Sequence, residues 1–526
     1  MRDFHLPGRS PVFAMNGMCA TSHPLASKVA VQIMESGGNA VDAAIASAVL
    51  LGICEPQMTG IGGDCFVLLS PNGTDDVIAL NGSGRAPSAL SAQELRAAGH
   101  KTIPIHGVEP VTIPGAIDAF CRLSKDYGKL SLASILAPAI YYANAGVPVA
   151  PRVARDWAVA ENFPQGDARK FYLLDGKAPR AGQVFRAPNQ AKVLERIALE
   201  GRDGFYQGEI SEDMVNSLNA LGGVHTLDDF ANNASEYTNP ISGEYKGTEL
   251  VEHPPNGQGA TAILLNNILA NFDIAGMDAL GSERAHIEAE ATKLAYDTRN
   301  RIIADPDYTT RLNHMLSPDT ANALAALIDP KRAMLNVKEI SENVHKDTVY
   351  ITVVDKDLMS ISLIYSTYHK FGSGIASEKF GINFQNRGHG FTLEQGHPNE
   401  AMGGRRPMHT IIPGMLRKNG KVTMPFGVMG GAYQPCGHTR IMSNMLDFGM
   451  DAQTAIDAPR CFADGTMMKV ERGYSDAVRA ELTDMGHSVT IPDEAIGGAQ
   501  SVHINYDTGI LEGASDPRKD GCALGY

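Results

Sequence analysis

Apolar residues near the start of the chain recur at helical spacing. Across residues 24–52 they fall three and four positions apart, which predicts helix, and a Gly-Gly pair divides this stretch into two segments. A glycine turn at 60–64 leads into an apolar run at 65–70, and a second such run follows at 77–80. Short apolar runs bounded by turn residues predict a pair of strands.

The hydrophobic pattern changes about two-thirds of the way along the chain. Helical periodicity dominates residues 113–345, whereas apolar and polar positions alternate after residue 348. No internal repeat or long polar linker separates the two parts, so we expect them to share one core. The predicted elements are helices at 131–145, 191–199, 284–301 and 438–449 and strands at 348–355, 359–366, 408–416 and 421–424.

The composition is that of an ordinary globular protein with an acidic balance. The 526 residues are 43% hydrophobic and 20% charged. The formal net charge is −14, which disfavours nucleic acid as a partner because phosphate binding needs a basic face. The first residues lack an apolar signal core, and no run of 18 apolar residues suggests a membrane span. We therefore expect a cytoplasmic protein with no membrane partner.

Cysteine and histidine are scattered along the chain. The seven cysteines include no Cys-x-x-Cys pair, and no compact Cys/His cluster suggests a metal site. The glycines at 60–63 follow a predicted helix, and no Gly-Lys-Ser/Thr sequence accompanies them, so a nucleotide site is disfavoured. No disulfide framework, metal or cofactor is expected.

Thr348 opens the predicted strand at 348–355. A threonine hydroxyl is a weak nucleophile unless a base lies beside it, and an N-terminal threonine can use its own α-amine as that base. Thr348 could reach this state only if the peptide bond after Asp347 were cut. Taken alone, Thr348 is more simply interpreted as an ordinary strand residue. The other motifs of the chain favour the nucleophile.

Ten short motifs accompany Thr348 in order along nearly the whole chain. Together they resemble the γ-glutamyltranspeptidase-like family of N-terminal-nucleophile hydrolases. That resemblance implies an α+β fold, a four-layer αββα sandwich, and a precursor that cuts itself into a large chain, 1–347, and a small chain, 348–526. The motifs are Asn39–Ala44, Thr59–Gly63, Arg85–Pro87, Ile113–Ala116, Pro254–Gly257, Asp305–Asp307, Arg406–Met408, Gly427–Gly431, Asp457–Arg460 and Gly513–Arg518.

The resemblance also implies the chemistry of the chain. The Thr348 hydroxyl would attack the carbonyl carbon of Asp347, and hydrolysis of the resulting ester would free the threonine α-amine. An α-amine titrates near pH 8, so at neutral pH part of it can accept the hydroxyl proton. Gly430 and Gly431 lie where the family places its oxyanion hole, and Ser366 matches a hydroxyl that supports the nucleophile. Without the family resemblance, a simple glycine turn before a helix is an equally good interpretation of Gly430 and Gly431.

The chain departs from the glutathione-cleaving members where they hold the glutamyl group. Gly390 stands in place of the aspartate that binds the α-ammonium, and Arg387 in place of a glutamine. Tyr368 replaces a strand asparagine. An arginine fork matches a carboxylate, so these changes predict a pocket that rejects an ammonium and accepts a carboxylate. A solvated loop arginine is the simpler alternative for Arg387.

Further differences from the glutathione-cleaving members also predict a smaller pocket that accepts a carboxylate. His409 and Thr410 replace a Ser-Ser pair, and the bulk of His409 would shrink the pocket. Arg85 lies two positions from the carboxylate-binding arginine of the family, so its reach to the substrate stays open. The substrate-binding residues expected from the sequence are therefore Arg85, Arg387, Tyr368, His409 and Thr410.

The pattern around these residues resembles the non-transpeptidase branch of the family, which contains the oxamate amidohydrolases. Oxamate is small and anionic and has no amine, so the expected function is hydrolysis of oxamate to oxalate and ammonia, in nitrogen salvage. The alternatives are a glutathione hydrolase or γ-glutamyltransferase with an altered pocket, an acylase for larger amides, and a non-catalytic binding protein on the same scaffold. The expected partners are a small anionic amide and the two chains of one precursor, and the oligomeric state stays open.

Overall fold

Two seven-stranded sheets form the centre of the molecule. The computed structural model describes residues 8–71, 76–162, 166–334 and 348–526. The first sheet has the order β1-β18-β17-β13-β12-β9-β8, and the second has the order β19-β2-β10-β11-β3-β4-β7. The first sheet comprises β1 (Val12–Ala14), β8 (Ile241–Tyr245), β9 (Thr248–Glu252), β12 (Gly414–Lys418), β13 (Lys421–Met429), β17 (Gly498–Asn505) and β18 (Ile510–Ser515).

The second sheet contains the strand pair predicted at the start of the small chain. Its central strands β10 and β11 pair antiparallel, with Val349 opposite Tyr365, and β11 pairs in turn with β3. Both sheets take strands from before and after residue 348. The strands are β2 (Gly17–Thr21), β3 (Asp64–Ser70), β4 (Ile78–Gly82), β7 (Glu236–Thr238), β10 (Val349–Asp355), β11 (Ser360–Ser366) and β19 (Cys522–Gly525).

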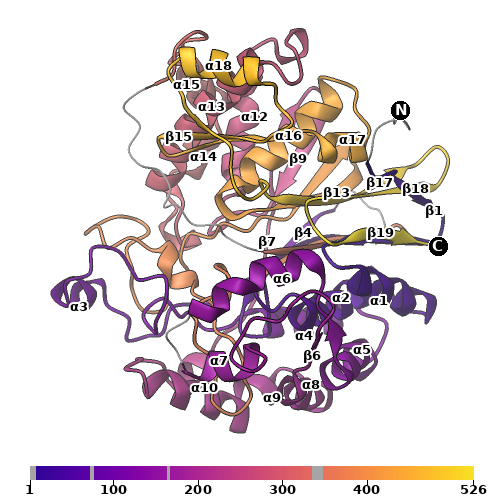
Figure 1. Cartoon of the computed structure of the whole chain (residues 1–526), viewed down its shortest axis with the longest axis vertical. Helices are drawn as coiled ribbons and strands as arrows, with labels where there is room; N and C mark the ends of the chain where they lie inside the picture. The colour runs from indigo at the N-terminus through magenta and orange to yellow at the C-terminus, as the bar shows by residue number, and fades with distance from the viewer. Residues whose placement is uncertain (1–7, 72–75, 163–165, 335–347) are drawn as a thin grey trace.

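Helices cover the outer face of each sheet, and the sheets pack against each other (Figure 1). The arrangement is the αββα sandwich of an α+β protein. Helices on the second sheet are α1 (Pro24–Glu35), α2 (Ala40–Cys54) and α4 (Ala116–Tyr127), with α5 (Leu132–Ala145) and α8 (Pro188–Glu200) outside them. Helices on the first sheet are α12 (Gly259–Leu269), α16 (Gln434–Leu446) and α17 (Ala452–Asp457), with α13 (Ser282–Ile302) packed on α12.

Shorter elements complete the described chain. None of the helices in its described parts is long and apolar enough to cross a membrane. The remaining α-helices are α3 (Ala92–Ala97), α6 (Pro151–Trp157), α7 (Gly166–Tyr172), α9 (Asp203–Tyr206), α10 (Glu209–Asn219), α11 (Leu227–Ala231), α14 (Leu312–Leu316), α15 (Pro318–Ala325) and α18 (Asp476–Asp484). Two small sheets comprise β14 (Cys461–Asp464), β15 (Met467–Val470) and β16 (Ser488–Thr490), and β5 (Val147–Pro148) and β6 (Val184–Phe185).

The helix break predicted at the Gly-Gly pair is present between α1 and α2. Gly37 has a φ of 95°, which glycine adopts without strain. Asn39 and Asp42 then form a reciprocal capping box at the start of α2. Every residue of α2 is buried, which explains why its sequence is apolar on all sides.

The strand predicted at 408–416 begins only at Gly414, so the prediction was wrong for its first six residues. The preceding backbone is held by other partners. The N–H of His409 donates to the carbonyl of Asn256, and its own carbonyl accepts the N–H of Gln258. The N–H of Ile412 donates to the side chain of Gln434. These bonds shape a loop beside the first sheet that contains two of the expected site residues.

Candidate active site

Thr348 directly precedes β10 in the centre of the second sheet. Its side chain is buried, and its hydroxyl donates a hydrogen bond to Ser366 Oγ at 3.4 Å. Ser366 ends the neighbouring strand β11. Because the two strands are antiparallel, the start of one and the end of the other meet at the same edge of the sheet. The structure thus brings together two residues that the sequence resemblance had paired.

Tyr368 follows β11 with a backbone conformation that is rare for an aromatic residue. Its φ is 83°, and its N–H donates to Ser366 Oγ at 2.8 Å. The tyrosine ring lies 4.1 Å from the guanidinium carbon of Arg387. Backbone strain of this kind concentrates at functional sites. Ser366 therefore supports both the candidate nucleophile and the ring that covers Arg387.

Gly430 and Gly431 form the turn between β13 and α16. Their φ angles of 122° and 56° lie in the region that favours glycine. A Cβ at Gly430 would come within 2.9 Å of the backbone of Gly497, so a larger residue would require the chain to shift. The turn is tight because the chain passes from a buried strand directly into a helix. Such a turn can present backbone N–H groups, as an oxyanion hole requires.

Gln258 connects this glycine turn to the loop beside it. Its Nε2 donates to the carbonyls of Thr410 at 2.6 Å and Gly431 at 3.0 Å. Its Oε1 accepts a hydrogen bond from Arg299 Nη1 at 2.7 Å, and all of these groups are buried. Sequence reasoning missed Gln258, although it directly follows the Pro254–Gly257 motif. Its amide fixes the turn relative to the expected substrate loop.

Arg387 is entirely buried, yet part of its guanidinium has no hydrogen-bond acceptor. Nη1 donates to Thr410 Oγ1 at 3.2 Å. Nη2 lies 3.5 Å from Asp64 Oδ1, but among the described residues neither Nη2 nor Nε makes a hydrogen bond. Burial lowers the pKa of Arg387, and the nearby Asp64 opposes this shift. Buried donors without acceptors are costly, so the fork is suited to a bound anion.

Asp64 joins Arg387 to His409. It begins β3 directly opposite Ser366, and its Oδ2 accepts the Nε2–H of His409 at 2.8 Å. The other ring nitrogen of His409 accepts the N–H of Ile411, so the imidazole is neutral. Burial, followed by the charge of Arg387, lowers the pKa of His409 to about 4. Asp64 is a second residue that sequence reasoning missed. Its position as the last residue of the glycine turn at 60–64 could have drawn attention to it.

Arg85 lies in a different cluster from Arg387. Its guanidinium bonds to the carbonyl of Gly404 at 2.9 Å and to Glu236 at 3.0 Å, and it lies 3.5 Å from Asp305. These contacts include none of the residues that contact Arg387. The structure therefore pairs the Arg85 side chain with protein groups and places it in a set of contacts separate from that of Arg387. Asp347, the other half of the expected cleavage site, lies outside the described residues.

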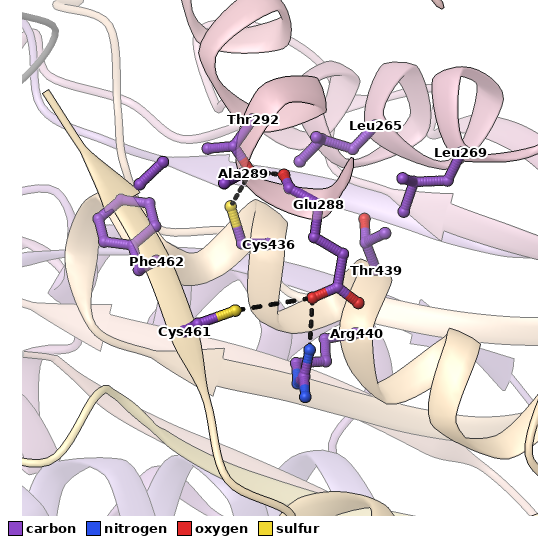
Figure 2. Close-up of a pocket in the computed structure, with 11 residues that line it drawn as sticks. Leu265, Leu269, Glu288, Ala289, Thr292, Cys436, Thr439, Arg440, Cys461 and Phe462 are labelled. Atoms are coloured by element: carbon purple, nitrogen blue, oxygen red, sulfur yellow. Dashed lines mark hydrogen bonds and ion pairs between the residues drawn. The ribbon is translucent and has the colours of Figure 1, made fainter. Parts of the chain in front are cut away.

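A second group of reactive residue types borders a small cavity between α12, α13 and α16 (Figure 2). Cys461 Sγ lies 3.9 Å from Glu288, which also pairs with Arg440. Burial raises the pKa of Cys461 to about 11 and that of Cys436 to about 12. These thiols are therefore protonated at neutral pH and poor nucleophiles. The cluster around Thr348 remains the better candidate for catalysis.

Comparisons with known proteins test the family that the sequence motifs resemble. The family model described as gamma-glutamyltranspeptidase matches residues 26–526. The chain belongs to this family. A glutathione hydrolase-like YwrD proenzyme of Bacillus subtilis is 35% identical, over 98% of this chain and 99% of its own length. An oxamate amidohydrolase proenzyme of Klebsiella pneumoniae is 33% identical, over 97% and 98%.

Solved structures place the fold in the same group. A cephalosporin acylase from Bacillus halodurans has a TM-score of 0.93 and 38% identity, with 100% of this chain and 99% of that chain covered. The γ-glutamyltranspeptidase of Helicobacter pylori has a TM-score of 0.57 and 27% identity, with 62% and 95% covered. The chain is thus an N-terminal-nucleophile hydrolase of amide C–N bonds, made as a proenzyme that is processed into a large and a small chain.

Buried neutral histidines make the stability of this protein depend on pH. Burial lowers the pKa of His409 and His23 to about 4 and that of His253 to about 3, against 6.5 for the free side chain. Between these values the unfolded chain binds more protons, so stability falls as pH falls below 6.5. Each such histidine contributes a slope of up to about 1.4 kcal/mol per pH unit. Thermal unfolding should therefore occur at a lower temperature at pH 5 than at pH 7.

The His409→Gln variant provides the control for this pH dependence. It removes one titrating group, so the dependence of its unfolding free energy on pH should become shallower by about one proton. Denaturant unfolding at several pH values measures this slope. An unfolding free energy that stays constant between pH 7 and pH 5 in the parent protein would contradict the prediction.

Proposed function

We propose that the mature protein hydrolyses oxamate, or a similarly small amide that has a carboxylate, with Thr348 as the nucleophile. The observation that carries the proposal is the buried Arg387, whose Nε and Nη2 lack hydrogen-bond acceptors within the described chain. A carboxylate would accept from both in a bidentate arrangement. The similarity to an oxamate amidohydrolase proenzyme supports the same substrate.

Thr348 and the Gly430–Gly431 turn each have a role in this proposed reaction. The Thr348 hydroxyl attacks the amide carbon of oxamate and passes its proton to the threonine α-amine. N–H groups of the Gly430–Gly431 turn stabilise the oxyanion. The C–N bond then breaks, and ammonia leaves with the proton held by the α-amine. Water attacks the oxalyl ester and gives a proton to the α-amine, which passes it to Thr348 Oγ as the ester C–O bond breaks and oxalate leaves.

The contacts of Arg387 limit the size of the substrate. The ring of Tyr368 covers one face of the guanidinium, Thr410 occupies Nη1, and Asp64 lies beside Nη2. The neutral His409 is held by Asp64 and adds bulk without charge. Gly390 contributes no side chain, and a Cβ there would come within 2.6 Å of the Met408 carbonyl. An aspartate at this position would therefore require a backbone shift.

A γ-glutamyl substrate is the second candidate, and Asp64 is the observation that favours it. Asp64 Oδ1 is buried and has no hydrogen-bond donor among the described residues, and it lies beside Arg387. An aspartate next to an arginine could bind the ammonium and carboxylate of an α-amino acid. The glutathione hydrolase-like relative is consistent with this reading. Because Asp64 Oδ2 already accepts a hydrogen bond from His409, only Oδ1 remains for an ammonium, and we rank this candidate second.

A substrate panel distinguishes the two candidates. Ammonia release should be readily measured with oxamate and should be at least about 100-fold slower with glutamine, because a buried ammonium would lack a free counter-charge. γ-Glutamyl-p-nitroanilide should be a poor substrate in the same enzyme preparation. Efficient transfer of a γ-glutamyl group to dipeptides, with oxamate inert, would refute the oxamate assignment.

The Asp64→Asn variant sharpens this comparison. An asparagine keeps the shape of the side chain and removes the charge that an ammonium would need. If the substrate is oxamate, the variant should retain ammonia release from it, since Arg387 supplies the carboxylate contacts. Loss of γ-glutamyl hydrolysis alone, from a parent that performs it well, would favour the second candidate.

A further inference from the structure

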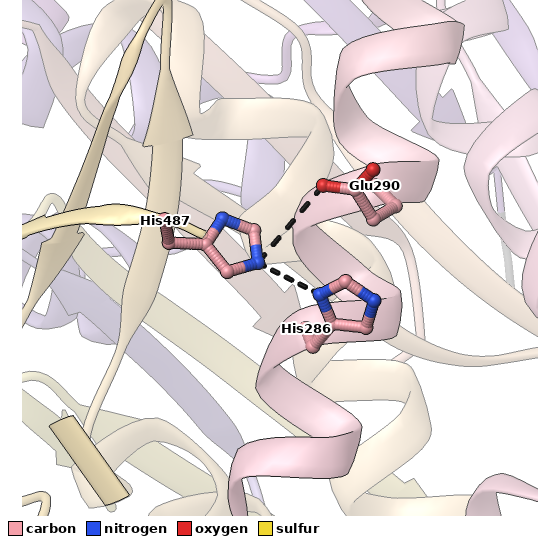
Figure 3. A group of neighbouring side chains, drawn as sticks. All are labelled: His286, Glu290 and His487. Carbon is pink, nitrogen blue, oxygen red and sulfur yellow. Dashed lines mark hydrogen bonds and ion pairs between the residues drawn. The ribbon is translucent and has the colours of Figure 1, made fainter. Parts of the chain in front are cut away.

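Two histidines and a glutamate from distant parts of the sequence meet inside the molecule (Figure 3). His286 and Glu290 lie one turn apart on α13, and His487 lies between α18 and β16. Their nearest ligand atoms all lie within 4.8 Å of one another, and all three side chains are buried. The cluster is separate from the residues around Thr348. Its residue types are those that bind zinc in proteins.

The ring orientation of His286 directs one imidazole lone pair into the cluster. His286 Nε2 lies 2.8 Å from the carbonyl of Asp329, and only its N–H can donate to that oxygen. His286 Nδ1 is then unprotonated, and it lies 2.7 Å from His487 Nε2. A backbone carbonyl that accepts from the far ring nitrogen and so fixes the tautomer is typical of metal-binding histidines. In the other tautomer of His487, its Nε2 also offers a lone pair.

Glu290 supplies the third oxygen or nitrogen atom of the cluster and is held in place by its neighbours. Its Oε2 accepts the N–H of Met334 at 2.8 Å, and its Oε1 lies 2.6 Å from Lys293 Nζ and 4.0 Å from His487 Nε2. Ligands of a tetrahedral zinc ion lie about 3.3 Å apart, given metal–ligand distances near 2.0–2.1 Å. The two histidine nitrogens are closer together than this, and His487 Nε2 and Glu290 Oε1 are farther apart. Small side-chain rotations would bring the three ligand atoms to tetrahedral spacing.

We propose that His286, Glu290 and His487 bind one divalent transition-metal ion of the zinc type. Three protein ligands leave a fourth position for water. The borderline-soft imidazoles favour such an ion over magnesium or calcium, which prefer oxygen ligands. The ion has no place in the amide hydrolysis and acts as a structural link.

The cluster lies where a metal ion would connect the large chain to the small chain. His286 and Glu290 lie in the large chain, and His487 lies in the small chain, if cleavage occurs before Thr348 as the proposed function requires. Asp329 and Met334 belong to the last described segment before residue 348, and the N–H of Ala333 also bonds to the carbonyl of Met485. The metal would therefore join the two processed chains close to the end of the large one.

Lys293 is the feature that competes with a metal. Its ammonium pairs with Glu290 and also reaches the carbonyl of Met334 at 3.3 Å. Without a metal, the Lys293–Glu290 pair and the hydrogen bond between the two histidines would provide polar partners for these buried side chains. A metal would have to share Glu290 with Lys293. The Lys293→Gln variant removes the competing charge and should bind the metal at least as tightly as the parent.

Zinc titration of the full-length, processed protein tests the proposal. After chelation and dialysis, calorimetry should detect one Zn²⁺ site per pair of large and small chains. His286→Ala and His487→Ala should weaken this binding by more than about 100-fold, since loss of a group that only orients a ligand already costs about 10–100-fold. Co²⁺ should give the visible absorption of a tetrahedral site in the parent and lose it in both variants. Zn²⁺ should also raise the temperature at which the two chains separate.

Controls separate metal binding from folding and from the proposed cleavage. Glu290→Gln keeps the side-chain shape and should still weaken binding, whereas His503→Ala, a partly buried histidine on β17, should leave it unchanged. The uncleaved Thr348→Ala precursor should bind Zn²⁺ like the parent, so failure of the cleavage assignment would not obscure the result. No equimolar Zn²⁺ binding by the folded parent, or equal binding by the His286 and His487 variants, would overturn the proposal.

Discussion

The Thr348→Ala protein is expected to remain one uncleaved chain and to have no measurable amidase activity. The substitution removes the hydroxyl that would attack the carbonyl of Asp347 and the substrate amide. Loss of a nucleophile typically costs at least about 10⁴-fold in rate. Gel electrophoresis should show one band for the variant and two for the parent. N-terminal sequencing of the smaller parental chain should begin Thr-Val-Tyr-Ile.

Two further variants give this experiment its controls. Thr348→Ser keeps a hydroxyl and should still process, because a serine can serve as the same kind of nucleophile. Ser366→Ala keeps the nucleophile but removes the acceptor for Thr348 and Tyr368, so processing should continue at a reduced rate. A small chain beginning at any other residue would show that Thr348 is not the nucleophile.

The fold could be predicted from the sequence where local pattern and tertiary position agree. The strands expected at 348–355 and 359–366 are β10 and β11 to within one residue, because both lie in the sheet centre and retain their apolar runs. The prediction of a strand at 408–416 was wrong for its first part, where the backbone hydrogen-bonds to a loop and to side chains and not to a neighbouring strand of the sheet. Apolar content alone could not reveal those partners.

The candidate site was predictable only in part. Thr348, Ser366, Arg387 and Thr410 could be named because each belongs to a recognisable motif, and the fold places them in linked contacts. Gln258 could not, because its function depends on reaching two carbonyls that lie 152 and 173 residues away.

Charge pairing was a further limit of the sequence reasoning. Arg387 was expected to form a positive pocket, but Asp64 lies beside it and balances its charge. The sequence left open whether Arg85 reaches the substrate, and in the structure Arg85 pairs with Glu236 and Asp305. Likewise, His286 and His487 are 201 residues apart and share no ligand motif, so their contact follows only from the fold. Which charges meet is a property of the tertiary structure.

Replacing Arg387 is expected to have the largest effect on substrate binding. In Arg387→Ala, oxamate would lose two charge-assisted hydrogen bonds, each worth roughly 1.5–3 kcal/mol. Their combined loss corresponds to a decrease in kcat/KM of about 10²–10⁴-fold, mainly through a higher KM. Self-cleavage should survive, because attack on Asp347 does not use the substrate carboxylate. Steady-state ammonia release and gel electrophoresis of one preparation measure both outcomes.

Two arginine variants make this prediction specific. Arg387→Lys keeps the charge but loses the planar fork, so its KM should lie between those of the parent and Arg387→Ala. Arg85→Ala should change KM by no more than about fivefold, because its partly exposed guanidinium is paired with Glu236 and Gly404. Normal oxamate kinetics in fully processed Arg387→Ala would move the carboxylate site elsewhere. A large KM increase in Arg85→Ala alone, with kcat and self-cleavage retained, would move the proposed carboxylate anchor from Arg387 to Arg85.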